Sequence, residues 1–108
     1  MEDDDVVRAL GALAHPQRLR AFRALVVAGA DGLTPGALVA LLGLPGNALS
    51  FHLKELAAAG LVSATRDGRH LIYRAAYTRM NAVLGYLTAN CCTGAPCDVD
   101  AAPPACGC

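Results

Sequence analysis

The dipeptide Asp67-Gly68 limits the folds open to this chain more than any other feature, because it separates two β-prone runs in an otherwise helical sequence. Asp-Gly fits a two-residue type I′ turn between antiparallel strands. The flanking runs cover residues 61–66 and 69–75, and together they predict one β-hairpin. The fold is therefore expected to be mainly α-helical with a small β-hairpin.

Prolines, glycines and one threonine mark the ends of the helical segments. Pro16 suits the first turn of a helix, and Gly29 suits its end. Thr34 and Pro35 are a typical N-cap and first helical residue, and Gly43 ends that short helix. Helices are predicted over residues 6–13, 16–28, 35–42, 46–59 and 77–88. With the hairpin placed before the last helix, this order predicts a winged helix-turn-helix.

The chain of 108 residues is long enough for one domain, at a size where dimerisation often adds stability. Residues 1–90 are assigned to the winged helix-turn-helix and residues 91–108 to a cysteine-rich tail. The uncharged stretch 32–53 is interrupted by prolines and glycines, so we expect no membrane span. The acidic start, residues 1–5, does not resemble a secretion signal. We therefore expect a cytoplasmic protein whose thiols stay reduced.

Positive charge is concentrated in the middle of the chain, although the net charge is zero. All nine basic residues lie between Arg8 and Arg79, where the only acids are Asp31, Glu55 and Asp67, so this segment carries nine minus three, or +6. The other acids lie near the two ends. A basic body of this kind is compatible with binding DNA phosphates, and also with plain solvation.

The helix predicted over residues 46–59 has one face that fits a DNA major groove. At about 100° per residue, Leu49, Leu53 and Leu56 share a face that points into the core. The opposite face carries polar side chains and one aromatic ring, which suit base edges, thymine methyls and phosphates. An ordinary solvated face is the alternative, and the neighbouring helix and wing favour DNA. The candidate DNA contacts are Asn47, Ser50, Phe51 and Lys54 on this helix, and Arg66, Arg69 and His70 near the hairpin tip.

The three histidines are not assigned to a metal site. His52 borders the apolar face of its helix, where a histidine is usually packed and hydrogen-bonded. His15 is expected to help begin the second helix. His70, near the wing tip, is expected either to contact a phosphate or to have no role.

Three segments resemble the ArsR/SmtB family of metal-responsive transcriptional repressors: LAHPQRLRAFRAL (13–25), ALSFHLKELAAAGLV (48–62) and RDGRHLIYR (66–74). The resemblance covers residues 6–90. It implies a homodimer with the first and fifth helices at its interface, and release of operator DNA when a metal ion binds. The apolar stripe of the fifth helix then supplies the interface candidates Val83, Leu84 and Leu87.

The chain departs from the family pattern in two places. Many members carry metal-binding cysteines on the helix before the recognition helix, where this chain has GALVALLG (36–43) and no thiol. The recognition helix often opens with a serine cap, where this chain has Pro45-Gly46. The chain is instead similar to arsenite-responsive members whose site lies at the C-terminus, with a Cys-Cys pair and a third cysteine a few residues later.

All five cysteines lie in residues 91–108, and the first three match that C-terminal arrangement. Trivalent arsenic is soft, prefers thiolates and forms three bonds. Cys91, Cys92 and Cys97 are therefore predicted to bind As(III) or Sb(III) as the inducer, and no organic cofactor is expected. Cys106 and Cys108 are accessory candidates.

Other thiol chemistries remain open for the tail. Zinc or cadmium needs a fourth ligand, which Cys106 or Cys108 would supply, whereas a methylated arsenical or a redox switch needs only two thiols. A disulfide staple is disfavoured in a reducing compartment. Catalytic thiols need an activating helix N-terminus or basic neighbour, and these follow a helix C-terminus, so no enzyme is expected. The predicted function is a homodimeric, As(III)-responsive repressor that binds operator DNA and dissociates when the metalloid binds.

Overall fold

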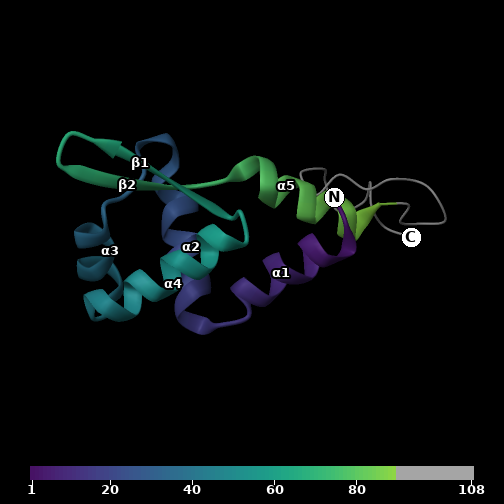
Figure 1. The fold of residues 1–108 in the computed structure, drawn as a ribbon, viewed down its shortest axis with the longest axis horizontal. Coiled ribbons are helices and arrows are strands. Elements are labelled where there is room, and N and C mark those ends of the chain that lie inside the picture. The colour runs from purple at the N-terminus through teal and green to yellow at the C-terminus, as the bar shows by residue number, and fades with distance from the viewer. Residues whose placement is uncertain (90–108) are drawn as a thin grey trace.

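The computed structural model describes residues 1–89 and has the predicted order of elements (Figure 1). The mainly α-helical winged helix-turn-helix is confirmed. The predicted ligands Cys91, Cys92, Cys97, Cys106 and Cys108 lie outside the described residues. The elements are α1 (Asp3–Leu13), α2 (Pro16–Ala28), the 3-10 helix η1 (Gly29–Asp31), α3 (Pro35–Leu42), α4 (Gly46–Ala58), β1 (Val62–Asp67), β2 (His70–Ala75) and α5 (Tyr77–Thr88).

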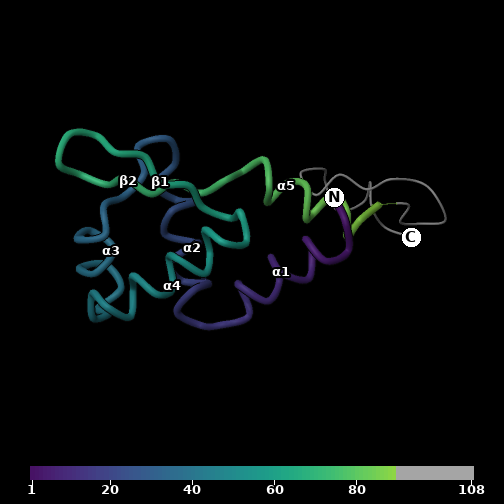
Figure 2. The backbone as a smooth tube through the Cα atoms, viewed as in Figure 1, coloured from purple at the N-terminus to yellow at the C-terminus, as the bar shows by residue number. Residues whose placement is uncertain are grey.

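Helices α2, α3 and α4 form one body with the hairpin, and α1 and α5 extend together from one end of it (Figures 1 and 2). Helix α2 packs against α1, α3, α4 and β2, so it lies at the centre of the contacts. The core is built from apolar side chains of all five α-helices and of the hairpin. The largest fully buried side chains are Leu25, Leu38, Leu49, Leu53, Leu56, Leu61 and Val83.

The predicted starts of α2 and α3 are confirmed by hydrogen bonds at their first turns. The backbone N–H of Gln17 donates to Nδ1 of His15 over 3.1 Å, so His15 caps α2. The backbone N–H of Ala37 donates to Oγ1 of Thr34 over 3.2 Å. Both bonds satisfy an N–H group that has no partner within its own helix.

Helices α3 and α4 form the helix-turn-helix, joined by the short turn at residues 43–45. Among the described residues, no single helix is long and apolar enough to cross a membrane. Only α3 and α4 taken together reach that length and composition, and they are bent by 112° at the break between them. An angle near this value is typical of a helix-turn-helix.

Helix α1 begins at Asp3, three residues before the predicted start at Val6. The prediction placed the acidic residues ahead of the helix, whereas Asp3, Asp4 and Asp5 form its first turn. There they are favoured by the positive end of the helix dipole. The carboxylate of Asp5 also accepts a hydrogen bond from the backbone N–H of Glu2 over 3.2 Å.

The hairpin turn lies one residue further along the chain than predicted. Asp67 pairs with His70, so the two loop residues are Gly68 and Arg69 rather than Asp67 and Gly68. Gly68 supplies the positive φ, +62°, that a primed turn needs at its first loop position. Arg69 is therefore part of the turn itself, and Arg66 faces Leu71 across the ladder.

A third backbone segment is attached to the hairpin, which the sequence did not reveal. Leu33 and Tyr73 exchange two backbone hydrogen bonds, of 3.0 and 2.9 Å. Nε of Arg74 donates to the carbonyl of Ala30 over 2.7 Å. Gly32, between these two anchor points, has φ +67° and ψ −172°. The hairpin is thus fastened to the connection between α2 and α3.

Candidate nucleic-acid interface

Helix α4 has the two-sided character that the sequence predicted. Its core face is formed by Leu49, Leu53 and Leu56, all of them buried. The opposite face is accessible, and it includes Phe51, which is 53% exposed. Its polar candidates Asn47, Ser50 and Lys54 are also exposed. Most of this face is therefore accessible in the part of the chain that the structure describes.

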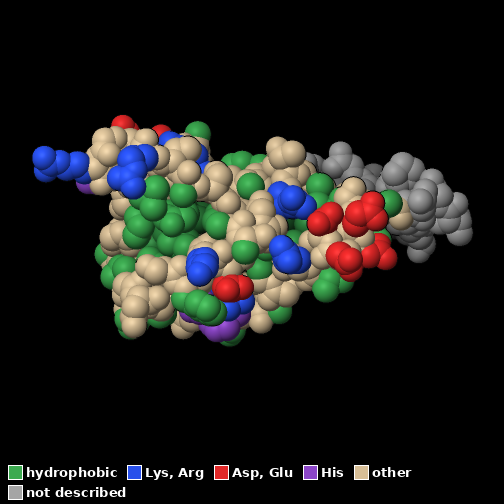
Figure 3. Space-filling model, viewed as in Figure 1, with side chains coloured by type: hydrophobic (Ala, Val, Ile, Leu, Met, Phe, Trp, Pro, Cys, Tyr) green, Lys and Arg blue, Asp and Glu red, His purple; other side chains and the backbone are tan. Residues whose placement is uncertain are grey.

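The hairpin tip forms a second accessible group of polar and basic side chains. Arg66, Arg69 and His70 are all exposed there. Figure 3 shows Lys and Arg side chains at the projecting end of the molecule that the hairpin forms, with some acidic atoms there, while the larger group of acidic side chains lies toward the other end. Those acids include Asp3, Asp4 and Asp5 in the first turn of α1. The charge distribution therefore favours a polyanion at the hairpin and disfavours one at the start of α1.

The side chain of Arg18, on α2, contacts α4. The sequence analysis did not single out this residue. Its guanidinium carbon lies 5.4 Å from the centroid of the Phe51 ring. Its Nε donates to Nδ1 of His52 over 3.3 Å. One arginine therefore contacts two successive residues of α4, the first of which belongs to the exposed face.

His52 is the buried polar side chain of α4, with 8% of its surface exposed. Its ring packs against that of His15, with 4.6 Å between the ring centroids and the two ring planes tilted by 47°. Burial, followed by the nearby His15 and Arg18, lowers the pKa of His52 below the usual histidine value. Neutral His52 is therefore the form that accepts the hydrogen bond from Arg18. The prediction that His52 is packed and hydrogen-bonded is confirmed.

The hydrogen bonds of the paired histidines also bear on metal binding. Nδ1 accepts a hydrogen bond in both His15 and His52, so in the neutral rings the proton lies on Nε2. Neither nitrogen then offers a free lone pair to a cation. Within residues 1–89, no group of three or more His, Cys, Asp or Glu side chains is placed to hold a metal ion.

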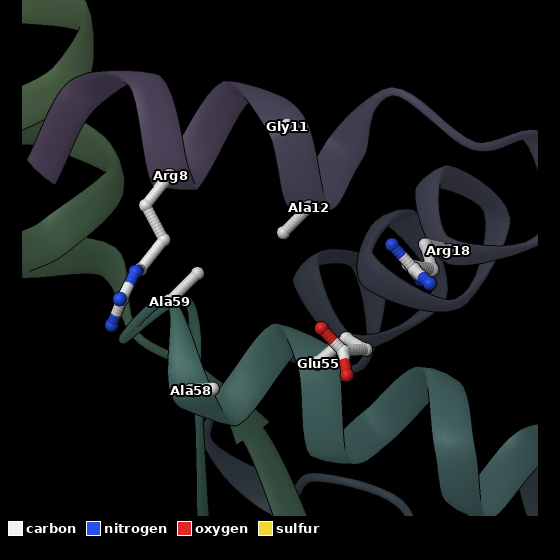
Figure 4. A pocket seen from close by; sticks show the side chains of 7 residues that line it. All are labelled: Arg8, Gly11, Ala12, Arg18, Glu55, Ala58 and Ala59. Atoms are coloured by element: carbon white, nitrogen blue, oxygen red, sulfur yellow. The ribbon is translucent and has the colours of Figure 1, made fainter. Parts of the chain in front are cut away.

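An open cleft of about 390 Å³ lies beside Arg18, between α1, α2 and α4. Figure 4 shows Arg8 reaching across it from α1, and Glu55 projecting from α4 toward the side where Arg18 lies. Small residues form the rest of the lining: Gly11, Ala12, Ala58 and Ala59. The Arg18 side chain therefore borders an open space as well as contacting α4.

The predicted interface residues of α5 differ in their exposure. Val83 is only 2% exposed, so it belongs to the core of the single chain rather than to an accessible face. Leu84 is half-buried, and Leu87 is 55% exposed. On the adjacent α1, Val7 is 67% exposed. Leu10 and Tyr86 add further exposed apolar surface to this pair of helices.

Comparison with known proteins gives consistent matches. The helix-turn-helix domain family matches residues 13–63. The chain is 40% identical over 88 residues to the HTH-type transcriptional regulator CmtR of Mycobacterium tuberculosis, covering 81% of this chain and 71% of that protein. It resembles the solved homodimeric winged helix-turn-helix DNA-binding domain of Mb0332 from Mycobacterium bovis, a possible ArsR-family transcriptional regulator. The TM-score is 0.63 at 27% identity, over 83% of this chain and 89% of that one. A solved possible transcriptional regulator for arsenical resistance is also similar, with a TM-score of 0.63 at 33% identity over 73% of this chain and 78% of that one.

Proposed function

Because the chain belongs to the ArsR family of winged helix-turn-helix transcriptional regulators, we propose that it is an arsenic(III)-responsive repressor. In this proposal a homodimer binds operator DNA and releases it when As(III) binds the C-terminal thiolates. The accessible polar face of α4, together with the exposed basic side chains of the hairpin tip, is the observation that supports the DNA-binding part. The cysteines of residues 91–108 support the metalloid part.

Each protomer places α4 in the major groove of one half-site, and the hairpin tip contacts the backbone beside it. The amide of Asn47 suits the edge of an adenine, and the ring of Phe51 suits a thymine methyl. Ser50 has a hydroxyl that bonds either to a base or to a phosphate. The basic side chains Lys54, Arg66 and Arg69, with His70, contact phosphates, so they add affinity without reading sequence.

We expect Lys54→Ala and Arg69→Ala to weaken binding to operator and non-operator duplexes alike. Each change removes one phosphate contact, so the slope of log K against log salt should fall by about 1. Asn47→Ala should instead reduce discrimination between operator and mutated sites, by about 1–3 kcal/mol for a bidentate base contact. Gel shifts over a salt series measure both effects.

Arg23→Ala is the matched control, because Arg23 is exposed on α2 and has no hydrogen bond to α4 or the hairpin. Unchanged operator affinity in all three variants would remove the DNA assignment.

The homodimer in this proposal forms through α1 and α5. These helices lie together at the end of the molecule away from the hairpin tip, and they leave Val7, Leu10, Tyr86 and Leu87 exposed. Apolar side chains grouped on one surface are typical of an interface between subunits. The homodimeric state of the similar Mb0332 domain supports a homodimer for this chain.

The donor set of the tail fits trivalent arsenic. Three thiolates complete the pyramidal coordination of As(III), and Cys91, Cys92 and Cys97 supply them from one chain. Sb(III) has the same preference for soft ligands. The similarity to a possible regulator for arsenical resistance supports a metalloid over zinc or cadmium. Cys106 and Cys108 are accessory in this proposal.

Metalloid binding reaches the DNA through the last turn of α5. That turn is held by a hydrogen bond from the hydroxyl of Thr88 to the carbonyl of Leu84 over 2.9 Å, and Cys91 follows soon after in the sequence. Drawing three cysteines together pulls on this turn and changes the angle between the two protomers. Both α4 helices must fit their half-sites at once, so a coupling of about 1–3 kcal/mol between the sites is enough to favour release.

We expect Cys91→Ser, Cys92→Ser and Cys97→Ser to give repressors that bind operator normally but stay bound in arsenite. Removing one thiolate leaves As(III) without its third soft ligand. Fluorescence anisotropy of labelled operator measures release, and Cys106→Ser and Cys108→Ser are the controls, which should respond as the parent does.

Testing arsenite, methylarsenite, antimonite, zinc and cadmium on the same proteins separates the alternative inducers. Release by zinc or cadmium alone, or by an oxidant alone, would contradict arsenic sensing. If Cys97→Ser releases operator in arsenite as the parent does while Cys106→Ser stays bound, Cys97 is not the third ligand.

A further inference from the structure

The contact between Arg18 and α4 joins a residue outside the recognition helix to the one aromatic ring on its exposed face. The guanidinium carbon lies 5.4 Å from the Phe51 ring centroid, and Nε donates to His52 over 3.3 Å. An arginine makes both contacts at once because its guanidinium is planar and carries donors along its edge. A lysine in its place would lack the planar group that stacks on the ring.

We propose that Arg18 is a positioning residue that holds the Phe51 ring in the orientation that recognises a thymine methyl group in the operator. The inference rests on the proposed function, because it assumes that α4 occupies the major groove. Arg18 itself need not touch DNA. It acts on base recognition through the ring that it contacts.

Phe51 needs such support because its ring is not held by the core. More than half of its surface, 53%, is exposed. Besides Arg18, the ring lies near the imidazole of His52, with 6.0 Å between the ring centroids in an edge-on arrangement. An exposed aromatic side chain changes rotamer readily, and ordering it on DNA costs conformational entropy. A cation stacked on the ring in the free protein reduces that cost.

His52 fixes the position of Arg18 in turn. The imidazole is 8% exposed and packs against the tilted ring of His15, so it is a well-held acceptor for the Arg18 Nε–H. The charged and titratable groups around this contact are Arg18 and His15 of the α2 region, Glu55 of α4, and Arg8 of α1 across the cleft. Protonation of His52 would remove the acceptor and place a second positive charge beside Arg18. The lowered pKa of His52 keeps the ring neutral near pH 7.5, so the arrangement should fail only in acid.

The test compares two forms of one operator, selected from random duplexes by affinity for the parent protein. One form contains thymine, and in the other each thymine in turn is replaced by deoxyuridine, which lacks only the methyl group. Burying one methyl group corresponds to about a fourfold change in affinity. We expect the parent to prefer thymine by about that factor at one position in each half-site. Phe51→Ala should lose the preference at that position.

Arg18→Lys and Arg18→Gln should also lose this preference, while keeping the thermal stability of a folded protein. Arg23→Gln is the control, since it removes the same charge from an exposed position on the same helix and should keep the preference. Because burial lowers the pKa of His52, the parent's preference should persist at neutral pH and decline only in acid, below the ordinary histidine range. His52→Gln, whose side-chain carbonyl accepts from Arg18 without titrating, should make it independent of pH. If Arg18→Gln does not fold, Arg18→Lys decides the matter because it retains the charge.

The inference is overturned if Arg18→Lys discriminates thymine as the parent does, or if Arg23→Gln loses discrimination equally. It is also overturned if the parent binds its operator but prefers no thymine at any position. Failure of the parent to select any duplex would instead remove the proposed function, so the two failures are distinguishable.

Discussion

Gly32→Ala is expected to lower the free energy of unfolding by about 3 kcal/mol or more. Gly32 has φ +67° and ψ −172°, a backbone region that is essentially restricted to glycine. A Cβ atom there would also lie 2.5 Å from the carbonyl oxygen of Tyr73 and 2.7 Å from Cγ2 of Ile72. Neither neighbour can retreat without breaking the attachment of the hairpin, so backbone strain and steric overlap add together. Urea unfolding followed by circular dichroism measures the loss.

Gly11→Ala is the matched control, because it adds the same methyl group to an exposed position within α1. A Cβ atom at Gly11 would meet nothing within 4 Å. Alanine is the better helix former, so this variant should be unchanged or more stable by up to about 1 kcal/mol. If Gly32→Ala were as stable as Gly11→Ala, the hairpin would not lie as close to residues 30–33 as the structure places it.

Leu87→Glu is expected to convert the protein to a monomer and to weaken operator binding by about a hundredfold or more. Leu87 is 55% exposed on the single chain, in the apolar group that the proposal places between the protomers. A carboxylate buried there without a partner costs several kcal/mol, and a monomer contacts only one half-site. Light scattering after size exclusion measures the mass, and anisotropy on operator DNA measures the affinity. A variant that remains dimeric would show that the protomers meet elsewhere.

Val83→Ala separates this interface effect from an effect on the core of each chain. Val83 is buried within the protomer, so its truncation should cost about 1–2 kcal/mol of unfolding free energy. The folded fraction should still dimerise and bind operator, because the accessible surface of α5 is unchanged. Loss of dimerisation in Val83→Ala at full stability would mean that this side chain turns outward when two chains associate.

The starts of α2 and α3 and the two faces of α4 were predictable because the signals are local. Thr34 and Pro35 determine the start of α3 by themselves, and the spacing of Leu49, Leu53 and Leu56 fixes which side of α4 meets the core. Such patterns depend on residues within one or two turns of each other. They can therefore be interpreted correctly without knowing how the elements pack.

The hairpin register was wrong by one residue because two overlapping turns are both acceptable locally. Asp67-Gly68 suits a type I′ turn, while a glycine in the first loop position, as in Gly68-Arg69, suits a primed turn equally well. The pairing of the strands beyond the turn decides between them, and that depends on which side chains meet the core. Local dipeptide preference carries no information about this.

The contacts of Arg18 were unpredictable for a different reason. Arg18 and His52 are 34 positions apart in the sequence, and the bond between them needs particular rotamers of both. Likewise, the bonds between Leu33 and Tyr73 join segments that are far apart in the chain. Sequence spacing identifies residues that share a face, but it does not say which side chains from two helices meet.

The attachment of the hairpin has a mechanical consequence for DNA selection. The two bonds between Leu33 and Tyr73, with the bond from Arg74 to Ala30, join the hairpin to the same body that carries α4. These bonds therefore hold the hairpin tip at a fixed distance from α4. In the proposed complex, a duplex whose groove and backbone do not match that distance would have to bend or twist to fit both α4 and the hairpin tip. The energy of deformation then falls on the DNA. The protein should therefore bind more tightly to operators with easily deformed base steps between the two points of contact, even where no side chain touches those steps.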